Sequence, residues 1–566
     1  MTIELSVDGR SVSVEDGALS LLDALREELG VRGPKDGCSP QGQCGCCTVW
    51  VDGAPRVACV TPVRRLAGRA VTTTAGLPEE TARRWADAMV AAGASQCGFC
   101  TPGIVMRLAA LERRTDGATA GAARRSLDEA AIRSALAAHL CRCTGWQTIV
   151  EAAGAVLGVA VGPGAGSVPG AAGVPGAPGG TGDAACDPPG GAARDPLLSS
   201  WRAQLEGPSF QTSTAATVLG RAGFADDTAP RSASVAVPSP EGGLVVERSL
   251  RAARDRSAMV QGRNSPVPLR HPLEIPDGDW TVTLRTAWVE PAYLEPDASW
   301  CAPGGVPASP LANGGAFGGK RRSPVASDAR RLADERAETV RVLWPREEVV
   351  RRGPKRPPVA AGVRADGSGV LRVARTASAR LDGYADRVRS AAPNLLVEEV
   401  EVAGPAVSVD LRCAGWLEAT VLAAVARALS EGTADPGSPV EVAAPSGGRA
   451  KVAVEPGGAV DVEVWAGEVL DEVVLRSYCL GAVHQALGLV RSEGIAVDEA
   501  GTVHDLTIRS YGILPARDTP WMNVMMHREA RWPINGSDAV LAATAAAAWI
   551  TDGLAPSWPT RTGGRR

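Results

Sequence analysis

Nine of the 13 cysteines in this chain lie before residue 144, in three groups. The first group places five cysteines in residues 37–59, GCSPQGQCGCCTVWVDGAPRVAC. The second is QCGFCTPG at residues 96–103, and the third is CRCTGW at residues 141–146. Closely spaced cysteines in a reducing compartment favour metal or redox chemistry over disulfides. We therefore interpret the three groups as two successive iron–sulfur sites.

The first group approaches the spacing of a plant-type [2Fe–2S] centre, C-x4-C-x2-C with a distant fourth cysteine. It contains one residue more than this pattern between its first two cysteines, and its glycines allow the loop to wrap an inorganic core. The predicted ligands are Cys38, Cys44, Cys47 and Cys59. Cys46 is then a spare thiol, although the extra residue leaves open that it replaces a neighbour. A zinc knuckle or buried free thiols are the alternatives.

The second and third groups supply another set of four thiols. A CxxC pair precedes one predicted helix, and a CxC pair follows another. A bundle that brings these two helix ends together gathers four sulfurs at one point. The predicted ligands of this second [2Fe–2S] cluster are Cys97, Cys100, Cys141 and Cys143.

The surrounding pattern predicts the elements that position these loops. Residues 3–15 and 48–59 alternate around Asp8-Gly9 and Asp52-Gly53, which are hairpin signals, and residues 19–29 have the leucine spacing of a helix. This is a β-grasp order, the small fold of plant-type ferredoxins, and we assign it to residues 1–77. Helical patterns follow at 79–92, 101–111, 126–140 and 148–157, with capping signals at Thr101-Pro102 and at 126–129. We expect a four-helix [2Fe–2S]-binding domain over residues 78–157.

The rest of the chain is less regular. Of residues 158–196, 12 are glycine and 7 are proline, so we predict a flexible linker over 158–197, in which Cys186 has no nearby partner. Residues 198–566 contain both strand and helix patterns. Strands are expected at 280–289 and 452–464, and helices at 416–429, 471–487 and 538–550. The overall expectation is an α+β protein whose C-terminal region is mixed α/β and forms one or two subdomains.

Charge and hydropathy exclude several partners. The formal charge of −4 and the pI near 5.9 do not suit binding to nucleic acid or anionic membranes. The sequence begins with a predicted strand and not with the charged and then apolar stretch of a signal peptide. Its longest apolar run, residues 539–550, is too short to span a bilayer. We expect a soluble, cytoplasmic protein.

The three cysteine motifs together resemble the iron–sulfur portion of the xanthine dehydrogenase (molybdenum hydroxylase) family, over residues 1–157. The resemblance implies a β-grasp domain and a helical domain with one [2Fe–2S] cluster each. It also implies that electrons pass from a molybdopterin site through the helical-domain cluster and the β-grasp cluster to a flavin or another acceptor. By the same resemblance, Gln96 hydrogen-bonds the pterin and Cys143 lies beside it while binding iron. The alternative for Gln96 is a helix-start residue that bonds the backbone.

Residues 312–320, ANGGAFGGK, resemble the glycine-rich loop that approaches molybdenum in this family. The cofactor-binding residues implied here are Gly314, Gly315, Phe317 and Gly318, and the alternative is a plain glycine loop. An intact molybdenum module is longer than this region. We find no FRGFG-like or GxGQG-type loop and no Gly-Glu pair near the C-terminus, although Asp538 lies in a suitable place. No catalytic residue is therefore identified.

The remaining polar candidates are expected to be ordinary. We interpret Glu290 and Glu295 as surface or strand-edge charges, the basic block at 353–358 and Arg476 as solvated, and His484 and His504 as histidines without clear partners.

The sequence thus predicts a molybdenum hydroxylase-type oxidoreductase, or its electron-transfer subunit, with two [2Fe–2S] clusters and a shortened molybdopterin-binding-like region at 198–566. That region holds the molybdopterin cofactor itself or leaves it to a partner chain. In the alternative hypothesis, residues 198–566 are a non-catalytic interaction or assembly module; a third hypothesis is a zinc-stabilised structural protein. No FAD-binding domain is recognised, so a separate FAD-binding subunit is the expected partner. A molybdopterin subunit is a second expected partner if this chain does not hold that cofactor. The small-molecule substrate is not identified.

Overall fold

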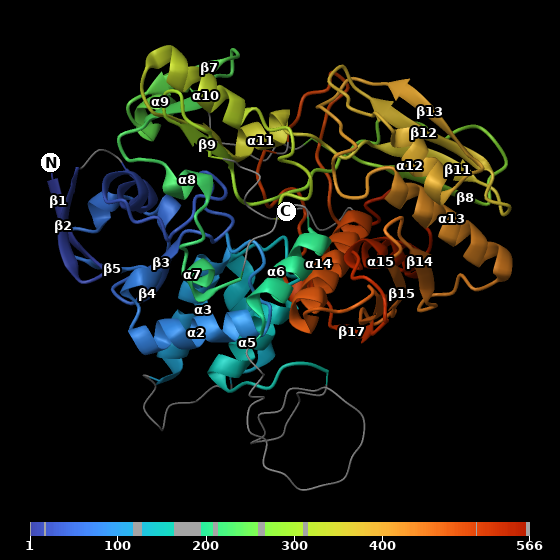
Figure 1. Ribbon diagram of the computed structural model, residues 1–566, viewed down its shortest axis with the longest axis horizontal. Coiled ribbons are helices and arrows are strands. Elements are labelled where there is room, and N and C mark those ends of the chain that lie inside the picture. Colours follow the sequence, from blue (N-terminus) through green and yellow to red (C-terminus); the bar gives the residue numbers. More distant parts are fainter. Residues whose placement is uncertain are drawn as a thin grey trace, which may run out of the picture.

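The computed structural model describes residues 2–15, 19–116, 127–163, 194–207, 213–258, 267–308, 315–504 and 506–561, with only the backbone of residues 114–116. Most of the predicted linker, Cys186 and Gly314 lie outside these residues. The elements form a mixed α/β structure with four sheets in the described chain (Figure 1). The domain boundaries drawn from the sequence stay predictions.

The N-terminal sheet contains the two expected hairpins. Its strands are β1 (Thr2–Val7), β2 (Arg10–Glu15), β3 (Thr48–Val51), β4 (Ala54–Val57) and β5 (Ala70–Thr72), in the order β2-β1-β5-β3-β4. Both hairpin turns use Asp-Gly pairs with positive φ, as the two-residue turns of hairpins require. The predicted helix at 19–29 is shorter and irregular: α1 (Leu21–Asp23) continues as a π-helical turn over Ala24–Glu28.

The four predicted helices that follow are all present. They are α2 (Glu79–Ala91), α3 (Thr101–Asp116), α4 (Glu129–Ala135) and α5 (Gln147–Leu157). The capping prediction for α4 is wrong, because Asp128 caps this helix by accepting a hydrogen bond from the Ala131 amide at 2.8 Å. Residue 126, predicted as the cap, lies outside the described residues.

Three further sheets form the C-terminal region. The first has the order β7-β6-β10-β9, the second β13-β12-β11-β8-β18 and the third β14-β15-β16-β17. Their strands are β6 (Ser234–Pro238), β7 (Leu244–Glu247), β8 (Val282–Thr286), β9 (Asp297–Cys301), β10 (Val340–Trp344), β11 (Val359–Val363), β12 (Gly369–Arg375), β13 (Leu395–Glu401), β14 (Val440–Ala443), β15 (Arg449–Val454), β16 (Val460–Trp465), β17 (Met522–His527) and β18 (Ser557–Trp558).

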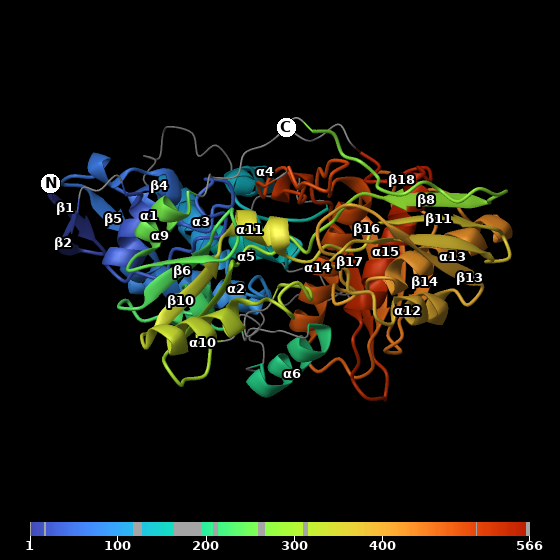
Figure 2. The ribbon, with the colours of Figure 1, turned by 90° about the horizontal axis from the view of Figure 1, so that it is seen from above.

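The helices of this region are α6 (Pro196–Glu206), α7 (Ala215–Val218), α8 (Ala225–Thr228), α9 (Leu250–Ser257), α10 (Val325–Arg336), α11 (Arg346–Arg352), α12 (Tyr384–Ala391), α13 (Trp416–Glu431), α14 (Glu472–Arg491) and α15 (Ser537–Thr551). They pack against the sheets or, as α6 and α7 do, against other helices. The α14 helix is long and apolar enough to cross a membrane, but 78% of its most apolar window is buried, as in the core helix of a globular protein. It packs against α15 at the centre of the structure (Figures 1 and 2).

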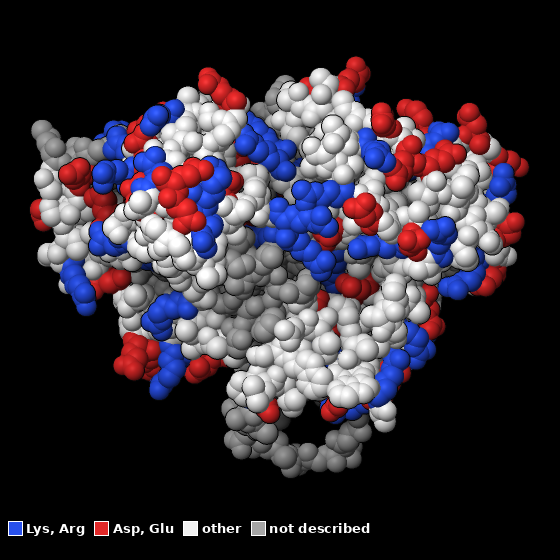
Figure 3. Space-filling model, turned by 45° about the horizontal axis from the view of Figure 1, so that its top comes forward, with Lys and Arg blue, Asp and Glu red and all other residues white. Residues whose placement is uncertain are grey.

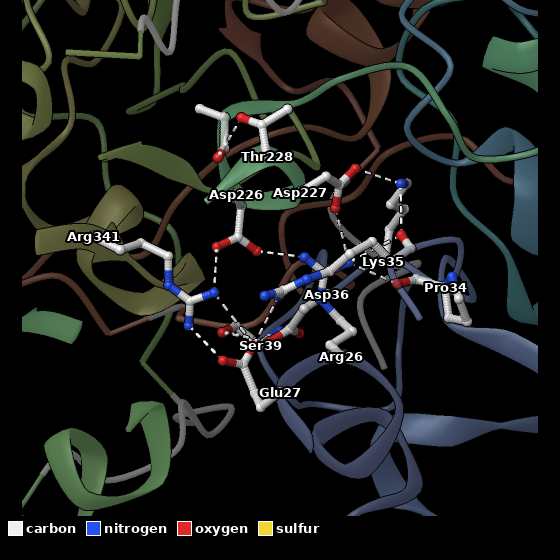
Figure 4. A network of polar contacts seen from close by, with 12 residues as sticks. Arg26, Glu27, Pro34, Lys35, Asp36, Ser39, Asp226, Asp227, Thr228 and Arg341 are labelled. Carbon is white, nitrogen blue, oxygen red and sulfur yellow. Dashed lines mark hydrogen bonds and ion pairs between the residues drawn. The ribbon is translucent and has the colours of Figure 1, made fainter. Parts of the chain in front are cut away.

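A buried ionic network fastens the N-terminal sheet domain to the segment that contains α8 and β10 (Figure 4). Arg26 pairs with Asp226 at 2.6 Å and with Asp227 at 3.0 Å. Lys35 also pairs with Asp227, and Arg341 reaches Asp226 at 3.3 Å. These charges lie beside the loop that begins at residue 37, so the C-terminal region helps to fix the first cysteine loop.

Surface charges of both signs are mixed on the face shown in Figure 3, with basic side chains gathered near its middle and acidic ones towards its sides. This mixture agrees with the small net charge of the chain.

Candidate iron–sulfur and cofactor site

The first predicted cysteine quartet lies at the edge of the N-terminal sheet. Cys38, Cys44, Cys47 and Cys59 are all buried. Their thiols contact one another in sequence: Cys38 contacts Cys44 and Cys59, and Cys59 contacts Cys47. The amides of Gln43 and Cys59 point at the sulfurs of Cys38 and Cys47, at 3.5 and 3.4 Å. Four sulfurs linked by pairwise contacts, with amide donors beside them, suit a [2Fe–2S] core.

Hydrogen bonds from the thiols of Cys44 and Cys59 lower the pKa of Cys38 well below its usual range. Cys38 therefore favours the thiolate, which is the form that binds iron, whereas the same contacts raise the pKa values of Cys44 and Cys59. No three His, Cys, Asp or Glu side chains in the described residues converge as a single metal ion requires. A two-iron core is larger, and each of its irons takes two thiolates. Sulfurs that touch in pairs fit this group.

Cys46 contacts one member of the first quartet, Cys44, but the run of contacts Cys44–Cys38–Cys59–Cys47 is complete without it. Its thiol faces Cys44, whose carbonyl oxygen is 3.8 Å away, and burial raises its pKa above the usual value even though the contact with Cys44 lowers it. The extra residue between Cys38 and Cys44 is accommodated in the loop, where Ser39 adopts a φ of 52° and its amide bonds Asp36 at 3.0 Å. The geometry therefore supports Cys47 rather than Cys46 as the ligand.

The second quartet lies where α3 begins and where the segment before α5 turns. The thiols of Cys97 and Cys143 are 3.5 Å apart, and Cys100 contacts Cys141. Hydrogen bonds from Cys100, and to a smaller extent from Thr144, lower the pKa of Cys141 to about 6. Two touching pairs of cysteines with one acidified thiol again suit a [2Fe–2S] core.

The two quartets are joined directly. The Leu140 amide, one residue before Cys141, donates a hydrogen bond of 3.0 Å to the carbonyl oxygen of Cys44. Gly103 of α3 lies against the first loop so closely that a Cβ there would be 2.3 Å from the Gly45 carbonyl oxygen. The ligand-bearing segments of the two quartets are thus in van der Waals and hydrogen-bond contact.

A cavity of about 390 Å³ opens beside the second quartet. Its lining includes Gln96 and Cys97 from the cysteine segment, the loop at 315–318, and the side chains of Arg321, Arg387, Arg412, Tyr478 and Asp538. Gln96 donates through Nε2 towards the Cys143 carbonyl and towards the carbonyl and hydroxyl of Ser477, each at 3.0 Å. Among the described residues, none donates to its Oε1. The backbone-bonding alternative for Gln96 is therefore observed, with one amide oxygen left for a ligand.

The glycine-rich loop makes close backbone contacts that a side chain would block. A Cβ at Gly315 would lie 2.8 Å from the Cys143 sulfur, and one at Gly318 would overlap the Asp410 carbonyl oxygen. Both glycines have positive φ, and so does Phe317 at 49°. The loop thus brings Gly315 against the second quartet and exposes Phe317 to the cavity. This position favours a cofactor loop over a plain glycine loop.

Known proteins match the cysteine-bearing part of the chain. A family model described as a [2Fe-2S] binding domain matches residues 73–154. The nicotinate dehydrogenase small FeS subunit of Eubacterium barkeri is 38% identical over 152 residues, 26% of this chain and 88% of that protein. A probable xanthine dehydrogenase subunit of Bacillus subtilis is 36% identical over 133 residues, 24% of this chain and 71% of that protein.

This chain belongs to the xanthine dehydrogenase (molybdenum hydroxylase) family. Members of this family are molybdenum hydroxylase-type oxidoreductases and their iron–sulfur subunits. Aldehyde oxidase 1 of Oryctolagus cuniculus is 39% identical over 160 residues, which are 26% of this chain but only 11% of that protein.

The whole chain is similar in fold to two solved aldehyde oxidoreductases. The aldehyde oxidoreductases of Desulfovibrio gigas and Desulfovibrio desulfuricans ATCC 27774 superpose with TM-scores of 0.63 and 0.64, at 14% identity, covering 99% of this chain and 99% of each of those chains. At this identity the likeness concerns the fold alone. It extends to the C-terminal region, beyond the residues that the relatives above match in sequence.

The structure locates an arginine that the sequence motifs did not reveal. Arg412 lines the cavity, and its amide donates a 3.0 Å hydrogen bond to the Phe317 carbonyl. It stands in Leu411-Arg412-Cys413-Ala414-Gly415, which shares the R-x-x-G spacing of the family's FRGFG-like loop. The aromatic residues of that loop are absent here, so only the R-x-x-G spacing could have indicated this arginine from the sequence.

Asp538 also lines the cavity, but it is not a free base. Its Oδ1 accepts a hydrogen bond of 2.7 Å from Arg412 Nε, while the Arg412 terminal nitrogens reach Ser537 and Gln485. Burial alone would lower the pKa of Arg412, but the Asp538 carboxylate raises it above its usual value. The carboxylate is thus held by an arginine and does not present a free base to a molecule in the cavity.

Several polar side chains expected at the surface are buried, and those predictions were wrong. Glu290 pairs with Arg346, and Glu295 pairs with Lys320 of the glycine-rich loop at 2.7 Å. Lys355 of the basic block is also buried, and the partly buried Arg356 pairs with Glu418. The segments that carry these side chains pack against other elements, so each charge is held with an opposite charge or a carbonyl.

Three further side chains, His484, His504 and Arg476, each have a partner in the structure. His484 is buried and bonds the Leu514 carbonyl at 2.9 Å, as an ordinary core histidine. His504, for which no partner was foreseen, lies 2.8 Å from Asp498. Arg476 pairs with Glu151 of α5 at 2.7 Å and so helps α14 contact the helical segment.

Proposed function

We propose that this protein is an electron-transferring component of a molybdenum hydroxylase, with two [2Fe–2S] clusters and a pterin cofactor site in one chain. The observation that carries the proposal is the position of the 390 Å³ cavity, which the predicted pterin residue Gln96 and the predicted ligand Cys97 both line. Bound clusters of this kind each accept and release one electron at a time. The proposal includes the domain boundaries 1–77, 78–157, 158–197 and 198–566.

The chain's own residues hold and insulate the relay. The first quartet, Cys38, Cys44, Cys47 and Cys59, and the second, Cys97, Cys100, Cys141 and Cys143, would supply the iron ligands. Of these eight side chains only Cys97 is not fully buried, and Cys97 lines the cavity. Burial excludes water from the sulfurs, and the hydrogen bond from Leu140 to Cys44 keeps the two quartets adjacent.

The cavity residues fit a pterin-type ligand. Gln96 presents an amide oxygen to a ligand N–H, and Gly315 and Gly318 let the backbone approach it without a Cβ. Phe317 offers an apolar contact, while Arg321, Arg387 and Arg412 suit an anionic group. Gly314, predicted with these residues, lies outside the described chain and stays a prediction.

A second candidate function is favoured by one specific contact. Because Asp538 is ion-paired with Arg412, the carboxylate nearest to the expected catalytic position is engaged. The C-terminal region would then hold the cofactor or a partner without performing hydroxylation itself. Relatives named as small or iron–sulfur subunits, such as the nicotine 6-hydroxylase small subunit of Paenarthrobacter nicotinovorans, support partner subunits. We propose a flavin-bearing chain as one of them, and a cytoplasmic location.

The test is metal and pterin analysis of the full chain, purified after coexpression with cofactor-assembly proteins. We expect about four irons per chain together with molybdenum and extractable pterin. Gln96→Ala should lose pterin but keep iron, and Asn523→Ala, a surface change, should keep both. A wild-type chain with two clusters but no pterin would contradict the pterin site and retain the electron relay. Iron for fewer than two clusters would overturn the proposal.

A further inference from the structure

Arg142 is a buried cation placed between two predicted ligands of the second cluster. It separates Cys141 from Cys143 in the chain, and only 6% of it is exposed. Its side chain leaves the cysteine segment and enters the C-terminal region, where Nε donates to the Pro291 carbonyl at 3.0 Å. A charge this close to a cluster acts on it across an interior of low dielectric constant.

The partner of this cation comes from the far end of the chain. Both terminal nitrogens of Arg142 bond the carboxylate of Glu493, with Nη2 2.9 Å from Oε2. Glu493 is fully buried and follows the C-terminal end of α14. Gly488 makes room for it, because a Cβ there would lie 2.1 Å from Oε1. The pair is therefore built by the tertiary fold.

A third side chain supports the carboxylate. The Tyr511 hydroxyl lies 2.9 Å from Glu493 Oε2 and 2.7 Å from the Glu290 carbonyl oxygen, so its single proton serves one acceptor at a time. Burial and the neighbouring Glu493 charge raise the pKa of Tyr511 well above its usual value, which keeps the hydroxyl a neutral donor. The Glu493 charge raises the pKa of Arg142 despite its burial.

Iron–sulfur potentials depend on net charge and hydrogen bonding around the cluster. Arg142 alone would favour the reduced, more negative cluster, and Glu493 cancels most of that effect. We propose that Glu493, acting through Arg142, sets the reduction potential of the second [2Fe–2S] cluster and so the driving force between the two clusters. This inference rests on the proposed relay, because it requires a cluster at the second quartet.

The test is a potentiometric titration of the full, cluster-loaded chain, followed by visible absorption and electron paramagnetic resonance so that each cluster is observed separately. Glu493→Gln keeps the shape and one acceptor oxygen but removes the charge that compensates Arg142, so the midpoint potential of the second cluster should rise. Arg142→Gln should lower it, and the double variant should return it close to the wild-type value. The first cluster should stay unchanged in all three.

Asp552→Asn is the matched control, because Asp552 pairs with the largely buried Arg491 at 3.0 Å without adjoining a cysteine. It should move neither midpoint. Shifts of the same sign in Glu493→Gln and Arg142→Gln, or no shift in either, would overturn the inference. If Glu493→Gln loses iron, Arg142→Gln and the double variant still show whether the midpoint potential of the second cluster falls and is then restored. A wild-type chain without the second cluster signal would instead defeat the relay proposal.

Discussion

The Leu140 amide donates a 3.0 Å hydrogen bond to the Cys44 carbonyl oxygen, and this bond joins the two cysteine quartets through the main chain. Cys44 belongs to the first quartet, and Leu140 immediately precedes Cys141 of the second. A ligand of the first quartet and a neighbour of a second-quartet ligand are therefore in direct hydrogen-bond contact. The proposed relay is therefore compact, and several of its parts can be tested separately.

The first prediction concerns the choice between Cys44 and Cys46. Cys44→Ser should destroy the first cluster, because the thiol of Cys44 contacts Cys38 within the quartet, and iron should fall from about four to about two per chain. Cys46→Ser is the control and should keep the full iron content. Iron analysis and the electron paramagnetic resonance spectrum check both. Loss of a cluster in Cys46→Ser would show that Cys46 is a ligand.

The second prediction concerns the contact between the cysteine loop and α3. Gly103→Ala would gain up to about 1 kcal/mol from helix propensity, but its Cβ would meet the Gly45 carbonyl at 2.3 Å and Cys46 at 2.9 Å. The clash should prevail and destabilise the fold by ~1–3 kcal/mol. Gly457→Ala, where a Cβ meets nothing within 4 Å, should be nearly neutral. Chemical denaturation measures both, and equal stabilities would contradict this packing.

The third prediction concerns the ionic network of Figure 4. Asp226 pairs with Arg26 and Arg341, and these arginines lower its pKa although burial alone would raise it. Asp226→Asn leaves two buried cations short of a partner and should cost ~3–5 kcal/mol of unfolding free energy. Asp255→Asn removes an exposed pair with Arg251 and should have little effect. Comparable losses in the two variants would mean that the network does not fasten the N-terminal domain.

The fourth prediction concerns pH. Burial raises the pKa of Glu295 to about 7, although Lys320 lowers it in part, while Asp297 and Asp227 add to the rise. The folded state therefore binds more protons than the unfolded state between about pH 4.5 and pH 7, and the contribution of Glu295 to stability is lost as pH rises through this window. Glu295→Gln should flatten the stability profile there.

The profile comes from denaturation midpoints measured at several pH values. Glu335→Gln, which alters an exposed ion pair with Arg331, is the control and should leave the slope unchanged. An unaltered slope in Glu295→Gln would show that this carboxyl does not titrate in the window.

The sequence by itself determined the local parts of this protein. Asp8-Gly9 and Asp52-Gly53 specify hairpins because few other pairs tolerate positive φ at both turn positions, and the observed turns agree. The helices near the second quartet follow from the spacing of their apolar residues. The cysteine quartets were readable because iron–sulfur ligation imposes short, characteristic spacings, and the family relation rests on the same residues.

Only the tertiary structure decided what surrounds these parts. Glu290, Glu295 and Lys355 read as ordinary surface charges, because sequence carries no record of a partner far along the chain. Arg142 and Glu493 are 351 residues apart, yet they share one buried pair. Arg412 enters the cavity because its loop folds against Phe317. Periodicity and spacing report neighbours along the chain, whereas burial and charge pairing depend on which distant segments pack together.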